Sequence, residues 1–157
     1  MTTDPTRPVP APGDDYFLSD WFTLDREHLQ QFAWSTYLDP EHVDLTVSHN
    51  NPLGADLVDG FWQVSMLLYF HFKYGAGGAD GEYGFNYGLD RVRFPAPLML
   101  GQRIRVHCQI LAAADHPSGT LVTTRNTMEV EGQERPCMVA DLLLLRIAPQ
   151  LNQGTTR

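Results

Sequence analysis

Cysteine and basic residues are both scarce in this 157-residue sequence. The only two cysteines, Cys108 and Cys137, form no CxxC pair, so we expect two reduced thiols, as in a cytoplasmic protein, rather than a disulfide framework. Eleven basic against nineteen acidic side chains give a net charge of −8. Because that charge repels a phosphate backbone, the composition argues against nucleic acid as a partner.

The sequence also lacks a membrane-spanning segment, a phosphate-binding loop and a metal-binding motif. The longest apolar segment, residues 61–72, is about a dozen residues long, whereas a membrane-spanning helix needs ~20. The glycine-rich segment GAGGADG, residues 75–81, lacks the lysine of a phosphate-binding loop. The histidines show no metal-ligand spacing with one another or with the cysteines. We therefore expect no membrane, no metal and no other cofactor.

Composition divides the chain into one domain and two tails. With 43% hydrophobic residues, the chain is long enough for a single domain with a core. Residues 1–13 are rich in proline and lack the apolar segment of a signal peptide, and residues 149–157 are mostly polar. We expect residues 14–148 to form the domain and both tails to be disordered.

The first half of the chain predicts two helices. Residues 16–24 are typical of a short strand, and Asp25 is a candidate cap for a short amphipathic helix over residues 26–35. A loop rich in turn-forming residues follows. Residues 61–72 are apolar on every side of the helical wheel, which predicts a helix buried all round.

The second half predicts antiparallel strands. Apolar side chains alternate with polar ones at Ile104, Val106, Cys108 and Ile110, the pattern of a half-buried strand. Residues 120–130 and 137–147 predict two further strands, joined by a short link suited to a hairpin. A buried helix followed by such strands indicates an α+β fold in which the sheet wraps around the helix.

Three segments carry a family resemblance. They read TYLDPEHVD at residues 36–44, LVDGFWQVS at 57–65 and NYGLDRVRFPAPLMLGQRI at 86–104. In this order they resemble the MaoC-like hydratase/dehydratase family, particularly its NodN-like branch, whose first two motifs read approximately GDxNPxHxD and IAHGxxxxS. The shared motif residues are Pro40, His42, Asp44, Gly60 and Ser65. The resemblance covers about residues 21–147 and implies a hotdog fold, an antiparallel sheet around one long helix.

The chain departs from the family motifs at three positions. Tyr37 stands where the loop has its catalytic aspartate, Asp39 replaces an asparagine, and Asp59 replaces the histidine of the helix motif. Enzymes of this family are thought to use the loop aspartate and histidine to activate water at the double bond of a 2-enoyl thioester. Of that pair, this chain keeps only the histidine.

The resemblance implies catalytic roles for three residues. His42 is the candidate general base, because histidine exchanges protons near neutral pH; the alternative is an exposed loop histidine. The Tyr37 phenol is neutral at that pH, so it would hold a substrate oxygen, donate a proton or simply fill space. Asp59 would orient His42, or cap the helix that follows it.

The same resemblance suggests three substrate-binding residues. The amide of Gly60, at the helix start, would polarise a thioester carbonyl, and the missing side chain would allow close approach; alternatively, glycine only relieves crowding. Ser65 is a weaker candidate, since buried helical serines commonly bond back to the backbone. Asn86 is a candidate for the pocket wall.

Three hypotheses of function follow. The first is a cytoplasmic homodimer that adds water to, or removes it from, an acyl thioester of coenzyme A or an acyl carrier protein. The second is a polyketide-tailoring enzyme that isomerises or cyclises its substrate, suggested by Tyr37 and by the aromatic residues of the long helix. The third is a non-catalytic partner subunit of a hydratase-like heteromer, which the lost aspartate favours.

Overall fold

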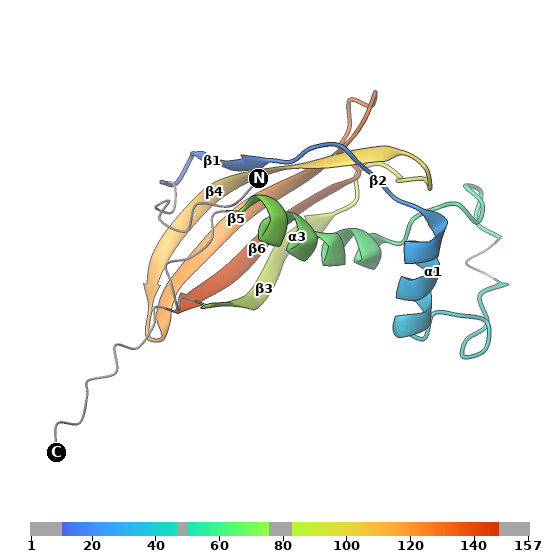
Figure 1. Ribbon diagram of the computed structural model, residues 1–157, viewed down its shortest axis with the longest axis horizontal. Coiled ribbons are helices and arrows are strands. Elements are labelled where there is room, and N and C mark those ends of the chain that lie inside the picture. Colours follow the sequence, from blue (N-terminus) through green and yellow to red (C-terminus); the bar gives the residue numbers. More distant parts are fainter. Residues whose placement is uncertain (1–10, 47–49, 76–82, 148–157) are drawn as a thin grey trace, which may run out of the picture.

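The computed structural model describes residues 11–46, 50–75 and 83–147 (Figure 1). Apart from residues 11–13, both predicted tails lie outside the described residues, as does most of the glycine-rich link after the long helix. Within the described ranges, no helix combines the length and the apolar character needed to cross a membrane.

The described strands form one antiparallel sheet. They are β1 (Asp15–Leu18), β2 (Phe22–Thr23), β3 (Tyr83–Arg93), β4 (Arg103–His116), β5 (Gly119–Val130) and β6 (Met138–Ile147). Their order is β1-β4-β5-β6-β3, and β2 also pairs with β4. The predicted hairpin is confirmed, because β5 and β6 pair antiparallel from Thr120 opposite Arg146 to Met128 opposite Met138. Strand β3 lies at one edge.

The predicted strand over residues 16–24 is divided into β1 and β2. The division lies at Ser19, which is 5% exposed. Its backbone amide donates to the Val106 carbonyl at 3.0 Å, while its hydroxyl accepts from the Val106 amide at 2.9 Å. A side-chain oxygen thus takes the place of a backbone acceptor, and the regular ladder stops there.

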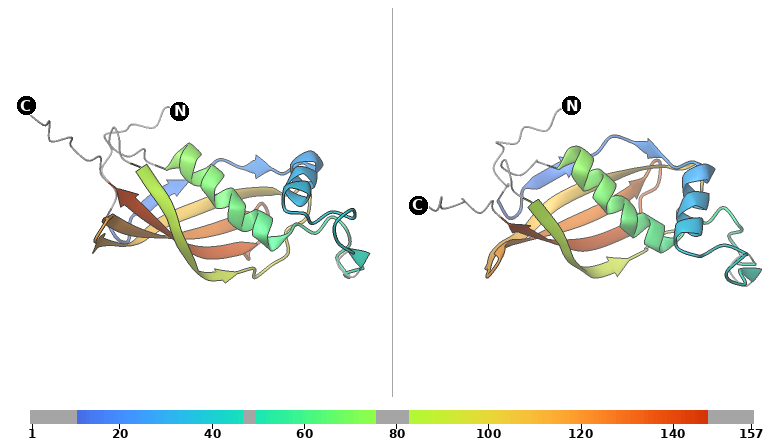
Figure 2. Two further views of the ribbon diagram at one scale, coloured as in Figure 1. Left: turned by 90° about the horizontal axis from the view of Figure 1, so that it is seen from below. Right: turned by 60° about the horizontal axis from the view of Figure 1, so that its bottom comes forward.

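The two helices lie close to their predicted positions. Helix α1 (Arg26–Ser35) begins after Asp25, whose carboxylate accepts from the His28 amide at 2.9 Å. Helix α3 (Gly60–Tyr74) crosses the concave face of the sheet (Figure 2). Helix α1 lies beyond the sheet, at the amino end of α3 (Figures 1 and 2).

The core lies between α3 and the sheet. Trp62, Leu67 and Phe70 of α3 are at most 3% exposed and belong to one cluster with buried side chains of β4, β5 and β6. The predicted alternation in β4 is confirmed. The inward-facing residues Ile104, Val106, Cys108 and Ile110 are all fully buried. A sheet curved around one long helix is the expected hotdog architecture.

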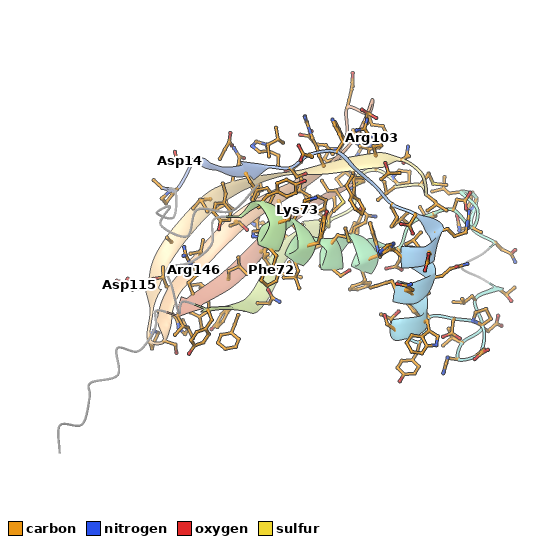
Figure 3. The ribbon with its side chains drawn as sticks, viewed as in Figure 1. Asp14, Phe72, Lys73, Arg103, Asp115 and Arg146 are labelled. Atoms are coloured by element: carbon orange, nitrogen blue, oxygen red, sulfur yellow. The ribbon has the colours of Figure 1, made fainter. Side chains whose placement is uncertain are left out.

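The prediction that α3 is buried all round is wrong. Phe61 is 77% exposed and Phe72, near the carboxyl end of α3 (Figure 3), is 84% exposed. The reason is that the sheet of a single chain covers only one side of the helix. Phe61, Ser65, Leu68 and Phe72 follow one another at helical spacing on the uncovered side. We call these four residues the outer stripe.

A buried polar contact joins α3 to the sheet. The imidazole of His71 lies with Nε2 2.8 Å from Oδ1 of Asn126 on β5. Because an amide oxygen only accepts, Nε2 carries the hydrogen. Asn126 is fully buried, and its Nδ2 donates to the Thr124 hydroxyl at 3.0 Å. Burial lowers the pKa of His71, against the smaller opposing effect of the Asn126 bond.

Both cysteines are free and buried. Burial raises the pKa of the Cys108 and Cys137 thiols to about 12 in each case. A thiol attacks as its thiolate, so neither cysteine is suited to be a nucleophile near neutral pH.

Candidate active site

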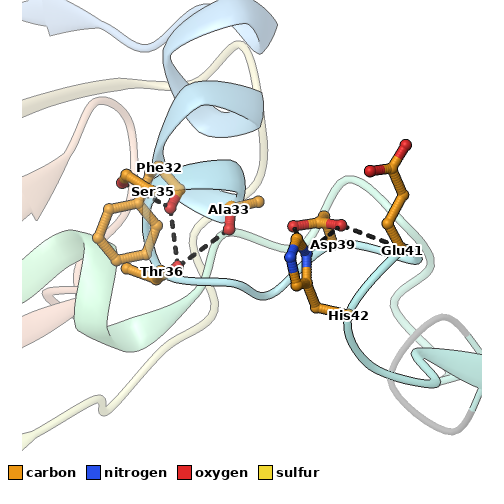
Figure 4. A network of polar contacts seen from close by, with 7 residues as sticks. All are labelled: Phe32, Ala33, Ser35, Thr36, Asp39, Glu41 and His42. Carbon is orange, nitrogen blue, oxygen red and sulfur yellow. Dashed lines mark hydrogen bonds and ion pairs between the residues drawn. The ribbon is translucent and has the colours of Figure 1, made fainter.

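The predicted catalytic loop carries an ordered histidine–carboxylate pair. Nδ1 of His42 lies 2.9 and 3.0 Å from the two carboxylate oxygens of Asp39, just beyond the carboxyl end of α1 (Figure 4). The same carboxylate accepts from the Glu41 amide at 2.9 Å, which holds it in place. The Asp39 side chain is 17% exposed and that of His42 is 43% exposed. With Nδ1 held by Asp39, Nε2 is the ring nitrogen that can exchange a proton with a ligand.

Tyr37 belongs to the turn that closes the carboxyl end of α1, and it contacts His42. Its amide donates to the Trp34 carbonyl at 3.2 Å, and the next amide, of Leu38, donates to the Ala33 carbonyl at 2.9 Å. These two bonds form a Schellman motif, in which the residue at position 37 takes a left-handed conformation; φ of Tyr37 is +60°. Its ring meets the imidazole of His42 edge to face, with centroids 4.9 Å apart. The phenol itself is largely exposed.

Asp59 caps α3. Its Oδ1 accepts from the Phe61 amide at 2.6 Å and from the Trp62 amide at 3.3 Å. The capping alternative is therefore confirmed, and the carboxylate that holds His42 is Asp39. Neither capping bond involves the Gly60 amide, which lies at the positive end of the helix dipole.

Gly60 lies under an aromatic ring. A Cβ at this position would meet the end of the Phe94 ring at 2.8 Å, closer than atoms pack. The side-chain space that the sequence left for a ligand is thus filled by Phe94, and crowding explains the glycine. Gly60 also lines a neighbouring pocket of about 310 Å³, which is open to the surface. The pocket is lined by Leu53, Leu57, Val58, Gly60, Gln63, Phe94, Ala96, Pro97 and Leu98.

A second pocket brings Ser65 and Asn86 together. It has a volume of about 210 Å³ and lies between α3 and strands β3 and β6. Its lining consists of Val64, Ser65, Leu67, Leu68, Asn86, Gly88, Leu89 and Leu142. The Ser65 hydroxyl donates to the Trp62 carbonyl at 2.8 Å, the backbone bond anticipated for a helical serine. The substrate-binding candidates are thus divided between two adjacent pockets on α3.

The loop pair and the pocket at Gly60 are separate in the described part of one chain. The pocket lining includes neither His42 nor Tyr37. The loop that follows α1 and the amino end of α3, where Gly60 lies, are nevertheless at the same end of the molecule (Figure 1).

Sequence reasoning missed Gln63. This residue lines the pocket at Gly60 and is 3% exposed, and its buried Oε1 has no hydrogen-bond partner among the described residues. The helical spacing of the sequence could have identified it, because Gln63 lies four and seven residues before Leu67 and Phe70, both buried in the core. That spacing places a polar residue on the buried face of an otherwise apolar helix.

Metal ligands do not gather in the described ranges, where no three His, Cys, Asp or Glu side chains form a group that could hold an ion.

Comparisons with known proteins agree with the fold. The family model described as "MaoC like domain" matches residues 8–132. A 3-hydroxyacyl-thioester dehydratase Z of Mycobacterium tuberculosis is 34% identical over 88% of this chain and 92% of the relative. Nodulation protein N of Rhizobium leguminosarum is 29% identical over 85% of this chain and 84% of the relative. The crystal structure of the HadBC (3R-hydroxyacyl-ACP dehydratase) complex from M. tuberculosis has the same fold, with a TM-score of 0.63 and 19% identity over 87% of this chain and 98% of that one.

Proposed function

This chain belongs to the MaoC-like dehydratase family, and we propose that it hydrates a 2-enoyl thioester or dehydrates the 3-hydroxyacyl form. The observation that supports this most strongly is the His42–Asp39 pair, which leaves Nε2 of His42 free to exchange protons. The 3-hydroxyacyl-thioester dehydratase among its relatives supports the same reaction class. The thioester is carried by coenzyme A or an acyl carrier protein.

His42, Gly60 and Tyr37 take part in the proposed reaction. A water oxygen bonds to C3 of the enoyl chain while Nε2 of His42 accepts a proton from that water. The electron pair of the double bond moves toward the thioester, and the developing enolate oxygen is held by the Gly60 amide at the helix start. The protonated imidazole of His42 then returns this proton to C2, which completes the addition and restores neutral His42, and the reverse steps eliminate water. Tyr37 keeps the imidazole in position through its ring contact.

Histidine substitution tests this proposal. In full-length protein, His42→Ala should reduce hydration of crotonyl-CoA, followed as loss of enoyl absorbance, by about 10²–10⁴-fold because a general base is removed. His28→Ala is the matched control, since His28 is also held by an aspartate three residues earlier, at 2.8 Å from Asp25, but on α1. Equal activity of the two variants would show that His42 is not the base. An isomer without added water, found by mass spectrometry, would favour the tailoring alternative.

We propose that the protein acts as a homodimer. The outer stripe leaves Phe61 and Phe72 exposed, and the adjacent edge strand β3 exposes Tyr83, Phe85 and Tyr87. Exposed aromatic residues beside an unpaired strand edge favour association with a second sheet. Pairing of two copies would cover both surfaces and bring the pockets on α3 near the interface.

Light scattering after gel filtration tests the pairing. Phe72→Ser should shift the protein from dimer toward monomer, whereas Trp34→Ser, at a 72%-exposed position on α1, should not. A monomer without either substitution, or a dimer unaffected by Phe72→Ser, contradicts this arrangement.

A non-catalytic subunit is the second candidate. It is favoured because the pocket at Gly60 is lined by neither His42 nor Tyr37, and because the Tyr37 phenol is not an anionic base. In that case the isolated chain would hydrate no enoyl thioester, and activity would require a second hotdog chain. Co-expression with such a chain, followed by purification and assay of the complex, distinguishes the candidates.

A further inference from the structure

Among the described residues that line the pocket at Gly60, Gln63 is the one with a polar side chain. The other side chains that line the pocket at Gly60 belong to leucine, valine, phenylalanine, alanine and proline. An amide oxygen buried without a partner costs about 1–3 kcal/mol relative to one that accepts a hydrogen bond. A leucine or methionine would avoid that cost at similar volume. The unpaired Oε1 of Gln63 therefore points to a ligand that brings a donor.

The position of Gln63 indicates which part of a ligand it meets. Gly60 is partly exposed, whereas Gln63, one helical turn later, is 3% exposed and lies deeper. A volume of about 310 Å³ cannot hold coenzyme A or a carrier protein, so the carrier stays outside and the acyl chain enters. With the thioester carbonyl at the Gly60 amide, the deeper residue meets the acyl chain.

The acyl chain of the hydrated substrate carries a donor at the right distance. Side chains three residues apart on a helix lie about 5–6 Å from each other, and the terminal amide of glutamine rotates readily. The 3-hydroxyl is two carbons beyond the thioester carbonyl, within that reach. The enoyl and saturated chains have no hydrogen-bond donor there. The hydroxyacyl form is the one that can satisfy Oε1.

Resting on the proposed function, we infer that Gln63 is a specificity-determining residue that accepts a hydrogen bond from the 3-hydroxyl of a 3-hydroxyacyl thioester. The bond selects the hydroxylated acyl chain over an unsubstituted chain of the same length. It also orients C3 and its oxygen relative to the Gly60 amide.

Calorimetric titration tests this selectivity. Full-length protein carrying His42→Ala, to prevent turnover, is titrated with 3-hydroxybutyryl-CoA and with butyryl-CoA. The hydroxylated ligand should bind about tenfold more tightly, the difference expected for one satisfied buried acceptor. Adding Gln63→Met should abolish that preference and leave the Kd of butyryl-CoA within about twofold. Gln31→Met, an exposed glutamine on α1 bonded to Glu27, is the matched control and should keep the preference.

Each other outcome overturns the inference. Equal binding of the two ligands by the protein with Gln63 shows that the hydroxyl has no such partner. A preference that survives Gln63→Met places the hydroxyl elsewhere, and equal weakening of both ligands places Gln63 against the carrier arm. If neither ligand binds, the assignment of the pocket at Gly60 as the acyl-binding site is wrong as well. Circular dichroism and Tm of Gln63→Met verify folding, which should be retained because an unpaired acceptor is removed.

The selectivity and the proposed reaction fail in different ways. If crotonyl-CoA is not hydrated by the unsubstituted protein, the proposed reaction is wrong even where the hydroxyl preference is observed. If hydration proceeds but Gln63→Met leaves ligand preference unchanged, only the role of Gln63 is wrong.

Discussion

Replacing Tyr37 by aspartate should increase hydration of enoyl thioesters. The tyrosine occupies a left-handed backbone conformation, with φ of +60°, two residues after Ser35, the last residue of α1. That conformation costs an ordinary L-residue about 1–2 kcal/mol, and aspartate and asparagine tolerate it better. Tyr37→Asp thus relieves strain and places a carboxylate at the start of the loop that holds His42.

The stability effect should be small because two contributions oppose each other. Relief of the backbone conformation favours the variant, while loss of the edge-to-face contact with His42 removes about 0.5–1.5 kcal/mol. The two nearly cancel, so the free energy of unfolding in urea should change by no more than about 1 kcal/mol. A change in activity can then be assigned to the carboxylate rather than to the fold.

Tyr37→Asn is the matched control, because asparagine has the same shape and the same backbone tolerance but no charge. A second group for proton transfer contributes about 10²–10⁴-fold to a rate. We therefore expect Tyr37→Asp to hydrate crotonyl-CoA at least about 100-fold faster than Tyr37→Asn. Equal rates for the two variants, with both proteins folded, would refute the placement of this loop beside the reacting carbons.

Three further predictions concern the helix α3. Burial lowers the pKa of His71, so its contribution to the free energy of unfolding is complete above about pH 6.5, the ordinary histidine value, and is lost as pH falls toward the lowered pKa. Urea denaturation between pH 7.5 and 5 should show this slope, at most about 1.4 kcal/mol per pH unit, and a His71→Gln variant with the same slope would contradict it. Gly60→Ala should lower the free energy of unfolding by about 1 kcal/mol, because the added methyl group would contact the Phe94 ring. In a double-mutant cycle, Phe94→Ala should remove this loss, and additive effects of the two substitutions would exclude the contact. Asp59→Ala should lower the free energy of unfolding by about 1 kcal/mol, because the helix cap is lost. Asp59→Asn still caps the helix and should keep both the stability and the enoyl-hydration activity. Loss of that activity in Asp59→Asn would show that the charge has a catalytic role.

The fold was predictable where one periodicity dominates. The alternation of apolar and polar residues around Ile104 and Val106 correctly predicted which face of β4 is buried. The capping residue Asp25 correctly predicted where α1 begins. The exposure of Phe61 and Phe72 was not predictable, because a helical wheel shows that a face is apolar but not whether the same chain covers it. The break at Ser19 depends on a hydroxyl bonded to a strand 87 residues later, which local pattern does not contain.

The candidate site was predictable in composition more than in geometry. The family resemblance identified His42, and the sequence suggested Asp59 as the carboxylate that orients it. The distances select Asp39. Asp59 was also a plausible cap from its position, and it is one. Gly60 was expected to leave room for a ligand, yet Phe94, 34 residues later, takes that room.

The bond between His71 and Asn126 fixes how far along the sheet the central helix lies. A slide of α3 by one turn would leave two buried polar groups without partners, so the helix has one axial setting. Gln63 lies eight residues before His71, about 12 Å along a rigid rod. In the proposed binding mode, the position of Gln63 therefore depends on a contact near the opposite end of the helix, and substitution of Asn126 should change the selectivity attributed to Gln63 although Asn126 does not contact the ligand.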